Sequence, residues 1–247
     1  MDIKQYLDST YLKTAEQSGL TEAENKKVAV GFIQEAIAAH FKLIMIRPEM
    51  VTVARKMILD AASRVLVGTV IDFPKGQSGM DKKLEEARKA ISDGADDLDF
   101  VCDYEAFKRG ETAKVKEEII HCTRLGLEHL KTVKWIIEVA ALDPHQIVQI
   151  CAFIKNIVIA NFKEEQFASV FIKSSTGFYQ TADNLPNGAT VPTIIMMLEN
   201  SCPLPVKAAG GVRSYDEAIA MIKLGVKRIG TSSAKAIAAG QVAENDY

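Results

Sequence analysis

The chain contains few cysteines, and their spacing does not match the usual metal or disulfide patterns. The four are scattered over 247 residues and none forms a Cys-x-x-Cys pair. Such pairs are typical of zinc sites, and dense cysteine is typical of small secreted domains. We therefore expect buried free thiols, as in a protein of the reducing cytoplasm. The cysteines are Cys102, Cys122, Cys151 and Cys202.

Histidine is equally scarce, and its spacing does not suggest a metal site either. Neither His-x-His nor His-Glu-x-x-His occurs, although these are the spacings that place two imidazoles on one ion. The histidines fall on predicted helices or their ends, and we expect no metal site. They are His40, His121, His129 and His145.

Long apolar runs and an excess of one charge are also missing. No uninterrupted apolar run approaches the roughly 18 residues of a membrane-spanning helix. The segment Met1–Lys4 lacks the apolar core of a secretory signal. The 30 basic and 32 acidic residues are interspersed and leave a net charge of −2, so no surface for nucleic acid or an anionic membrane is indicated. A soluble cytoplasmic protein that binds small molecules is expected.

Short apolar segments recur along the whole chain and predict strands. Most are rich in Val, Ile and Leu without strict alternation, which is typical of parallel strands covered by helices. The candidate strands are Gln5–Leu12, Lys42–Ile46, Arg64–Ile71, Asp97–Val101, Thr132–Val139, Ser169–Ser174, Leu204–Ala208 and Lys227–Gly230.

Helix signals fill the intervals between these strands. Capping boxes begin at Thr21 and Ser214, and Asp143-Pro144 opens a third helix. Eight strands, each followed by helical sequence, predict a single (β/α)8 TIM barrel rather than an open sheet. No linker divides the chain, so we expect one domain over residues 1–247 with a mobile tail from about residue 240. Tyr247 could reach the site with its hydroxyl or belong to an ordinary frayed end.

Lys173 ends an apolar strand and precedes a run of hydroxyl residues and glycine. Burial of an amine disfavours its charged form, and a neutral lysine can attack a carbonyl to form a Schiff base. Covalent carbonyl chemistry is therefore predicted at Lys173. Lys207 closes the next strand. If the two strands are neighbours, its ammonium group drives Lys173 toward the neutral form, although Lys207 could instead be a solvated phosphate-binding lysine.

Glycine-containing turns follow two consecutive predicted strands, the seventh and the eighth, and Thr176-Gly177 is expected beside them. Phosphate is often held by the loops after strands 7 and 8 of this barrel type, where glycine lets backbone N–H groups approach a ligand. These turns therefore predict a phosphate-binding cradle beside Lys173. Its residues are Thr176, Gly177, Gly210, Gly211, Gly230, Ser232 and Ser233.

Two carboxylates interrupt apolar strands and need buried partners. Asp99 is predicted to pair with a lysine across the barrel and to act in catalysis, and Asp8 has a similar setting. Either could instead be a structural ion pair or a strand-end cap. Lys134 lies mid-strand, so we expect it to form a structural pair, with Glu138 or another carboxylate, rather than the Schiff base.

These segments together resemble the deoxyribose-phosphate aldolases, a class I aldolase family of the (β/α)8 type. The resemblance spans nearly the full chain, and the Phe-Ile-Lys-x-Ser-Thr-Gly and Val-Lys-x-x-Gly-Gly-Val-Arg blocks are specific in combination. The matching blocks are Leu7-Asp8-Ser9-Thr10, Ile46-Arg47-Pro48, Val70-Ile71-Asp72-Phe73-Pro74-x-Gly76, Ala95-x-x-x-Asp99, Lys134-x-Ile136-Ile137-Glu138, Phe171 to Gly177, Val206 to Arg213 and Gly230 to Ser233.

The resemblance implies reversible cleavage of 2-deoxyribose 5-phosphate to glyceraldehyde 3-phosphate and acetaldehyde. Lys173 matches the Schiff-base lysine, Lys207 the second lysine that perturbs it, and Asp99 the acid that acts in proton transfer. Asp8 matches a further carboxylate near that relay. No cofactor is implied, because the protonated imine is itself the electron sink. The family commonly forms dimers, so a homodimer is expected.

Three residues depart from the family pattern and leave alternatives open. Met45 stands where many members carry cysteine, Asp72 where a neutral residue precedes Phe-Pro, and Ser9 where a bulkier residue is common. Asp72 could repel the substrate phosphate or pair with a lysine. The departures allow a Schiff-base enzyme with another donor or acceptor. A phosphosugar-binding barrel without catalysis is the third reading, although the reactive lysine and its acid are both present.

Overall fold

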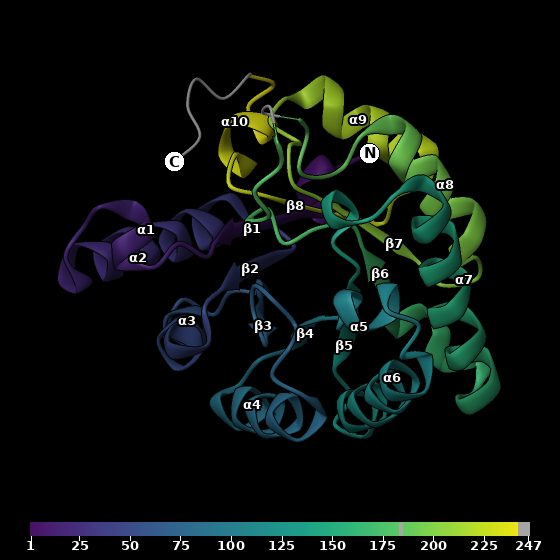
Figure 1. Ribbon diagram of the computed structural model, residues 1–247. Helices are drawn as coiled ribbons and strands as arrows, with labels where there is room; N and C mark the ends of the chain where they lie inside the picture. The colour runs from purple at the N-terminus through teal and green to yellow at the C-terminus, as the bar shows by residue number, and fades with distance from the viewer. Residues whose placement is uncertain (183–184, 242–247) are drawn as a thin grey trace.

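The computed structural model describes residues 1–182 and 185–241, and within them eight parallel strands close into a barrel. Each strand pairs with the next along the chain, and β8 pairs with β1 (Figure 1). The predicted (β/α)8 barrel is confirmed. The strands are β1 (Leu7–Tyr11), β2 (Leu43–Ile46), β3 (Leu66–Ile71), β4 (Asp97–Val101), β5 (Thr132–Ile136), β6 (Val170–Lys173), β7 (Val206–Ala209) and β8 (Arg228–Thr231).

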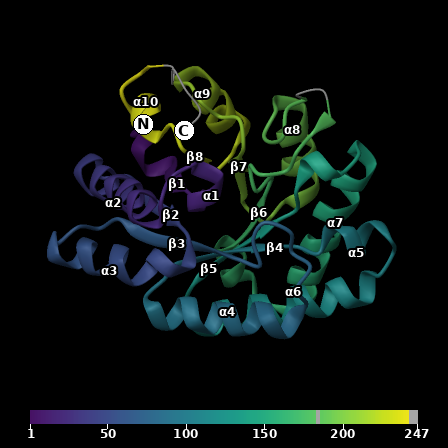
Figure 2. The same cartoon turned by 60° about the vertical axis from the view of Figure 1, so that its left-hand side comes forward.

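Helices follow the strands and form the outer layer, as the two ribbon views show (Figures 1 and 2). The longest are α2 (Glu22–Ala39), α6 (Thr112–Glu128) and α7 (Pro144–Asn161). The others are α1 (Ala15–Ser18), α3 (Val51–Asp60), α4 (Met80–Asp93), α5 (Tyr104–Lys108), α8 (Val191–Ser201), α9 (Tyr215–Leu224) and α10 (Ala234–Ala238). Short 3-10 turns cover Ile3–Tyr6, Pro48–Met50, Val139–Ala141 and Glu164–Ser169.

The predicted helix starts are confirmed by their caps. Thr21, Asp143 and Ser214 each accept a hydrogen bond from the backbone N–H three residues ahead, and the side chain at that position bonds back to the cap. These reciprocal bonds satisfy donors that a helix cannot satisfy within itself.

The predicted strand boundaries differ from the observed ones by up to three residues, and two of the differences have a clear physical cause. The first strand does not begin at Gln5, because Ile3–Tyr6 form a 3-10 turn whose N-cap is the side chain of Asp2. The fifth strand does not reach Val139: it ends at Ile136, and Glu138 lies in the left-handed region with φ 54°. Such a backbone turn is uncommon for a residue with a Cβ, so the apolar pattern gives no sign of it.

The cysteine prediction holds for three of the four residues. Cys102, Cys122 and Cys151 are free and buried, whereas Cys202 is free but exposed. Cys202 was therefore placed wrongly: it follows the last residue of α8, in the turn that leads to β7. Within the described residues, no helix is long and apolar enough to cross a membrane. The predicted tail from about residue 240 and the proposed role of Tyr247 fall largely on residues 242–247, outside the described part of the chain.

The barrel interior is apolar on one side and ionic on the other. Leu43 on β2 is in register with Asp8 on β1, and Val70 on β3 is in register with Asp99 on β4, so all four side chains face inward. Leu12, Leu43, Met45 and Val70 form a separate buried apolar cluster there. Strand β1 and strands β4 to β8 contribute acidic and basic side chains to the interior, and these side chains form the candidate site.

Candidate active site

Lys173 and Lys207 lie side by side on adjacent strands. Lys173 is the last residue of β6, and its register partner on β7 is Lys207. In a parallel sheet, residues in register project to the same face, so both amines enter the barrel near the carboxyl ends of the strands. The predicted juxtaposition of the two lysines is present.

Asp99 connects three lysines inside the barrel. Its Oδ2 accepts from Lys173 Nζ at 2.9 Å and from Lys207 Nζ at 3.0 Å. Its Oδ1 accepts from Lys134 Nζ at 2.8 Å. Lys134 therefore forms a structural pair, as predicted, but with Asp99 and with Asp97, at 2.6 Å, rather than with Glu138.

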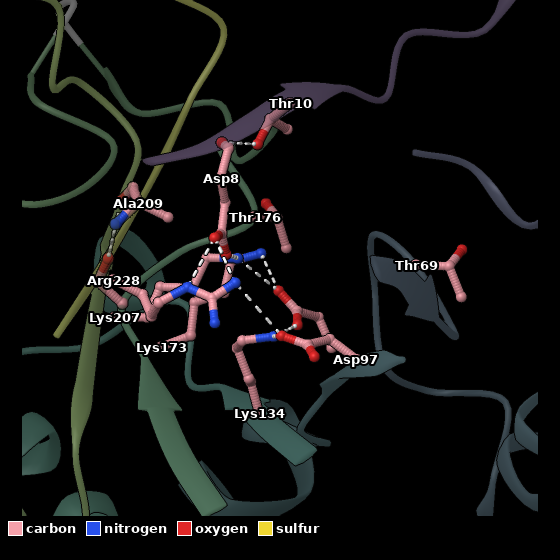
Figure 3. A network of polar contacts seen from close by, with 12 residues as sticks. Asp8, Thr10, Thr69, Asp97, Lys134, Lys173, Thr176, Lys207, Ala209 and Arg228 are labelled. Carbon is pink, nitrogen blue, oxygen red and sulfur yellow. Dashed lines mark hydrogen bonds and ion pairs between the residues drawn. The ribbon is translucent and has the colours of Figure 1, made fainter. Parts of the chain in front are cut away.

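Asp8 joins this group from β1 and is shared between two basic residues. Its Oδ2 is 2.6 Å from Lys207 Nζ, and its Oδ1 accepts from Arg228 Nε at 2.7 Å. Arg228 also approaches Asp97 at 3.4 Å, which closes the network (Figure 3). Sequence reasoning missed Asp97 and Arg228. The Asp97-x-Asp99 spacing in an apolar strand, which places two carboxylates on one face, was the available signal for Asp97.

We refer to these seven side chains as the ionic network. With every member charged it carries four cations against three carboxylates, and so has one positive charge in excess. Its cations are Lys134, Lys173, Lys207 and Arg228, and its anions are Asp8, Asp97 and Asp99.

Burial has opposite consequences for the amine and for its carboxylate partner. Burial, helped by the nearby ammonium groups of Lys207 and Lys134, lowers the pKa of Lys173 to about 8 despite the attraction of Asp99. Burial alone would raise the pKa of Asp99, but Lys134, Lys173 and Lys207 outweigh it and hold that pKa well below its usual range. The network thus holds an ionised carboxylate against an amine that is neutral in an appreciable fraction of molecules near pH 7–8.

Lys173 is the network member that reaches the cavity at the barrel mouth. It is 3% exposed and lines a cavity of about 280 Å³, whereas Lys207, Asp99 and Asp8 are completely buried and do not line it. A molecule in this cavity therefore meets the amine of Lys173 first. The other charged groups act on it from beneath.

Six of the seven predicted phosphate-binding residues line the same cavity. Ser233 does not line it, and its backbone N–H already donates to Thr231 Oγ1 at 3.0 Å. Two cations that the sequence analysis did not single out, Lys13 and Arg213, also line the cavity. The six are Thr176, Gly177, Gly210, Gly211, Gly230 and Ser232.

The glycines of the cradle serve different purposes. Gly177 and Gly211 have φ of 83° and 85°, and a Cβ on either would meet nothing within 4 Å, so their backbone is open to a ligand. Gly210, with φ 81°, allows close backbone contact with Gly188, since its Cβ would lie 2.9 Å from Gly188 Cα. A Cβ on Gly230 would lie 3.0 Å from Lys207 Cε, so this glycine makes room for the lysine.

Glu138 braces the loop that follows Lys173. Its Oε2 accepts from the backbone N–H of Thr176 at 3.2 Å and from the Thr176 hydroxyl. Its Oε1 is buried and has no hydrogen-bond partner within the described residues. Burial raises the pKa of Glu138 to about 7, even though the two bonds from Thr176 and the charge of Lys173 oppose that change. The sequence analysis gave Glu138 no such role.

None of the three departures from the family pattern lines the cavity that Lys173 reaches. Asp72 approaches Lys83 Nζ at 3.6 Å and accepts from the backbone N–H of Ser78 at 2.9 Å, so it pairs with a lysine and does not line the cavity. Ser9 is completely buried and does not line the cavity either. Met45 is fully buried in the apolar half of the barrel, where its Cε would lie 2.6 Å from a Cβ on Gly68.

Comparison with known proteins gives a consistent set of similarities. Residues 12–240 match the family model described as DeoC/LacD family aldolase. The chain is 35% identical over 241 residues to the deoxyribose-phosphate aldolase of Thermococcus gammatolerans, covering 97% of this chain and 96% of that protein. It is 32% identical over 248 residues to the deoxyribose-phosphate aldolase of Streptococcus pneumoniae, with both chains covered in full.

Solved structures agree with these similarities. The aldolase QR15 has a TM-score of 0.79 at 30% identity and covers 97% of this chain and 95% of its own. The deoxyribose phosphate aldolase of Aeropyrum pernix, described as a tetramer, has a TM-score of 0.74 at 24% identity, with 96% and 89% covered. At that identity the likeness shows the fold alone.

Proposed function

The chain belongs to the DeoC/LacD family of aldolases, and we propose that it reversibly cleaves 2-deoxyribose 5-phosphate to glyceraldehyde 3-phosphate and acetaldehyde through a Schiff base on Lys173. One observation carries the proposal: Lys173, whose pKa burial lowers to about 8, lines a cavity that a glycine-rich turn also lines. The amine supplies the nucleophile, and the turn supplies backbone N–H groups for an anion.

The reaction begins with the neutral amine of Lys173. Its nitrogen attacks the aldehyde carbon C1 of the open-chain sugar phosphate and forms a carbinolamine, which loses water to give a protonated imine. Because burial lowers the pKa of Lys173 to about 8, the required neutral form is accessible near neutral pH.

Cleavage then uses the imine as an electron sink. Loss of the proton from the C3 hydroxyl turns C3 into the aldehyde carbon of glyceraldehyde 3-phosphate. The electron pair of the C2–C3 bond passes into the enamine formed by C2, C1 and the lysine nitrogen. Protonation at C2 and hydrolysis of the imine release acetaldehyde and restore the free amine.

Next to the reacting atoms, Asp99 stabilises positive charge and Lys207 transfers protons. Asp99 stays ionised, because three ammonium groups hold its pKa well below the usual range. It therefore stabilises the positive imine nitrogen that forms on Lys173. Lys207, which donates to the same Asp99 oxygen at 3.0 Å, is the group through which protons reach the site. Asp8 pairs with Lys207 at 2.6 Å and holds its amine in place.

The phosphate group is assigned to the glycine-rich end of the cavity. The open backbones of Gly177 and Gly211 offer N–H donors, and Lys13 and Arg213 line the same cavity with positive charge. Ser232 and Thr176 add hydroxyl groups. Ser233 does not line the cavity, and its role in phosphate binding stays a prediction.

Reductive trapping tests the proposal directly. Incubation with acetaldehyde and sodium borohydride is expected to add a two-carbon group, located on Lys173 by peptide mass spectrometry. Lys173→Ala should lose the adduct and the cleavage of 2-deoxyribose 5-phosphate together. An adduct confined to exposed lysines, or undiminished cleavage by Lys173→Ala, would refute the proposal.

A homodimer and a cytoplasmic location are also proposed. Large apolar side chains are exposed on the adjacent helices α7 and α8, namely Ile159 at 45%, Val191 at 44% and Ile195 at 37%, and a second copy could cover them. The free thiols agree with a reducing compartment. Light scattering during size-exclusion chromatography measures the assembly, and a monomer at micromolar concentration would contradict the dimer.

A further inference from the structure

Arg228 is the arginine of the ionic network, and it lies outside the cavity wall. It opens β8, is 6% exposed, and does not line the cavity that Lys173 reaches. Its register partner on β7 is Lys207. Arg228 therefore cannot touch a substrate in that cavity, and any effect on the reaction must pass through its neighbours.

The contacts of Arg228 are all with carboxylates that also bind lysines. Its Nε and Nη2 donate to Asp8 Oδ1 at 2.7 and 2.5 Å, while Lys207 holds the other Asp8 oxygen. It approaches Asp97 at 3.4 Å, and Lys134 holds the same Asp97 oxygen at 2.6 Å. Each carboxylate that Arg228 contacts is therefore shared with a lysine, so its negative charge stabilises the ammonium form of that lysine less.

A charge count shows what this sharing does. Without Arg228, three lysines would face three carboxylates, and the network would be neutral with every lysine protonated. Arg228 adds a cation that cannot lose its proton in a protein. The excess positive charge is then relieved by releasing a proton from one of the lysines.

The geometry identifies which lysine releases the proton. Lys134 is paired with both Asp97 and Asp99, and Lys207 with both Asp8 and Asp99. Lys173 is paired with Asp99 alone, on an oxygen that Lys207 also uses. Lys173 is thus the amine with the weakest hold on its proton.

We propose that Arg228 is a positioning residue for the Schiff-base reaction: by occupying Asp8 and Asp97 from below, it leaves the network with one cation in excess and so keeps the amine of Lys173 available as a nucleophile. This proposal rests on the proposed function and extends it to a residue that touches no reacting atom. Every strand around Lys173 is accounted for: β1 contributes Asp8, β4 Asp97 and Asp99, β5 Lys134, β7 Lys207 and β8 Arg228.

The elements that do not belong to the network leave this account unchanged. β2 and β3 contribute the apolar side chains Leu43, Met45 and Val70. Glu138, just beyond β5, is the further carboxyl group whose charge acts on Lys173, and it is bonded to Thr176 rather than to a lysine. Substituting Arg228 alters neither group directly.

The test compares Arg228→Met with Arg228→Lys. In the Met variant we expect the acid limb of the pH profile of kcat/KM for 2-deoxyribose 5-phosphate to move up by about one to three pH units, the usual range for a lost neighbouring charge. Activity at pH 7 should fall about tenfold or more and recover as the pH approaches 10. The Lys variant keeps the charge and should keep the wild-type limb. Arg109→Met, at a side chain 56% exposed, is the matched control and should leave the profile unchanged.

A second measurement does not depend on aldolase activity. The pH dependence of Lys173 acetylation by dilute acetic anhydride, followed by peptide mass spectrometry, reports how readily this amine loses its proton. It should shift upward in Arg228→Met by the same amount as the kinetic limb. If wild type neither cleaves the sugar phosphate nor traps acetaldehyde, the proposed function fails, yet this acetylation shift still tests the role of Arg228.

Lys134→Met keeps the test decisive if Arg228→Met does not fold. It removes another cation that lies beneath Lys173, while Arg228 still contacts Asp97 and two lysines still contact Asp99. It should move the acid limb in the same direction. An unmoved limb in these variants, an equal loss of activity at every pH, or a Lys variant that shifts as far as the Met variant would each overturn the proposal.

Discussion

Lys173 and Lys207 donate to the same oxygen, Asp99 Oδ2, at 2.9 and 3.0 Å. Two ammonium groups on one carboxylate oxygen repel each other, and the one with fewer other partners gives up its proton more readily. Lys207 has Asp8 as a second partner and Lys173 has no other carboxylate in the ionic network. The shared oxygen therefore couples the proposed nucleophile to the lysine that we propose transfers protons.

Replacing Lys207 with Met is expected to remove both of its effects. Lys173 would hold its proton more tightly, and the route for protons would be lost. At pH 7 we expect kcat to fall about 100-fold or more, at the lower end of what general acid–base catalysis contributes. Raising the pH should not restore activity, in contrast to Arg228→Met.

Steady-state kinetics from pH 6 to 10 distinguishes the two variants. Borohydride trapping at high pH should still label Lys173 in Lys207→Met, because the amine itself remains. Full recovery of kcat at pH 9.5 would mean that Lys207 acts on the amine alone and carries no protons.

Lys173 is expected to make the folded protein less stable at neutral pH. Its pKa of about 8 in the fold lies below the ordinary 10.5, so the unfolded chain binds this proton more tightly. Stability therefore falls as the pH drops from 10.5 through 8, and the full cost is present below pH 8. A difference of that size corresponds to about 3 kcal/mol. Lys173→Met should thus raise the free energy of unfolding at pH 7 by up to about 3 kcal/mol.

Urea unfolding at pH 7 and pH 10.5 measures this effect. The gain should be largest at pH 7 and should shrink toward pH 10.5. Lys56→Met, on the exposed face of α3 with 75% of its side chain accessible, is the control and should show little change at either pH. A Met variant less stable than wild type at pH 7 would contradict the expected cost.

Glu138 should weaken the fold as the pH rises through neutrality. Its pKa of about 7 lies above the ordinary 4.5, so its contribution to stability is fully present below pH 4.5 and is lost as the pH passes about 7. Glu138→Gln retains an oxygen for the two bonds from Thr176 and carries no charge. We expect the variant to be more stable than wild type at pH 8.5, by up to about 3 kcal/mol, and nearly equal to it at pH 5.

Thermal or urea unfolding at the two pH values checks this expectation. Glu49→Gln provides the control, since that side chain is 67% exposed beside Arg47. If wild type and Glu138→Gln lose the same stability between pH 5 and 8.5, Glu138 is already ionised throughout that range.

The difference between what could and could not be predicted from the sequence follows from the range of the interactions involved. Lys173, Lys207 and Asp99 end or interrupt apolar strands, so each is marked by its own immediate neighbours. Arg228 bonds Asp8 across 220 positions of the chain, a contact that exists because β8 closes against β1. No local pattern reports such a pairing.

Backbone conformation is the second reason why part of the site could not be predicted from the sequence. Glu138 continues an apolar run by pattern, but its φ of 54° turns the chain out of β5 and brings its carboxylate under Thr176. Glycine marks such turns in sequence, as at Gly177 and Gly211, whereas a glutamate in the same conformation does not. The glycine turns of the phosphate cradle could therefore be predicted from the sequence, whereas the role of the Glu138 carboxylate, which bonds Thr176, could not.

The cradle itself can be tested at Gly211, which pairs a left-handed backbone with open space. Gly211→Ala would cost roughly 1–2 kcal/mol of backbone strain and would place a methyl group beside the phosphate-binding N–H groups. We expect KM for 2-deoxyribose 5-phosphate to rise about tenfold or more, with the kcat/KM of unphosphorylated deoxyribose nearly unchanged. Gly19→Ala is the matched control, because Gly19 has φ 67°, meets nothing within 4 Å, and caps α1 outside the cavity. It should carry the same strain without the change in KM. Equal losses for both substrates in Gly211→Ala would show that the turn shapes the site without holding phosphate.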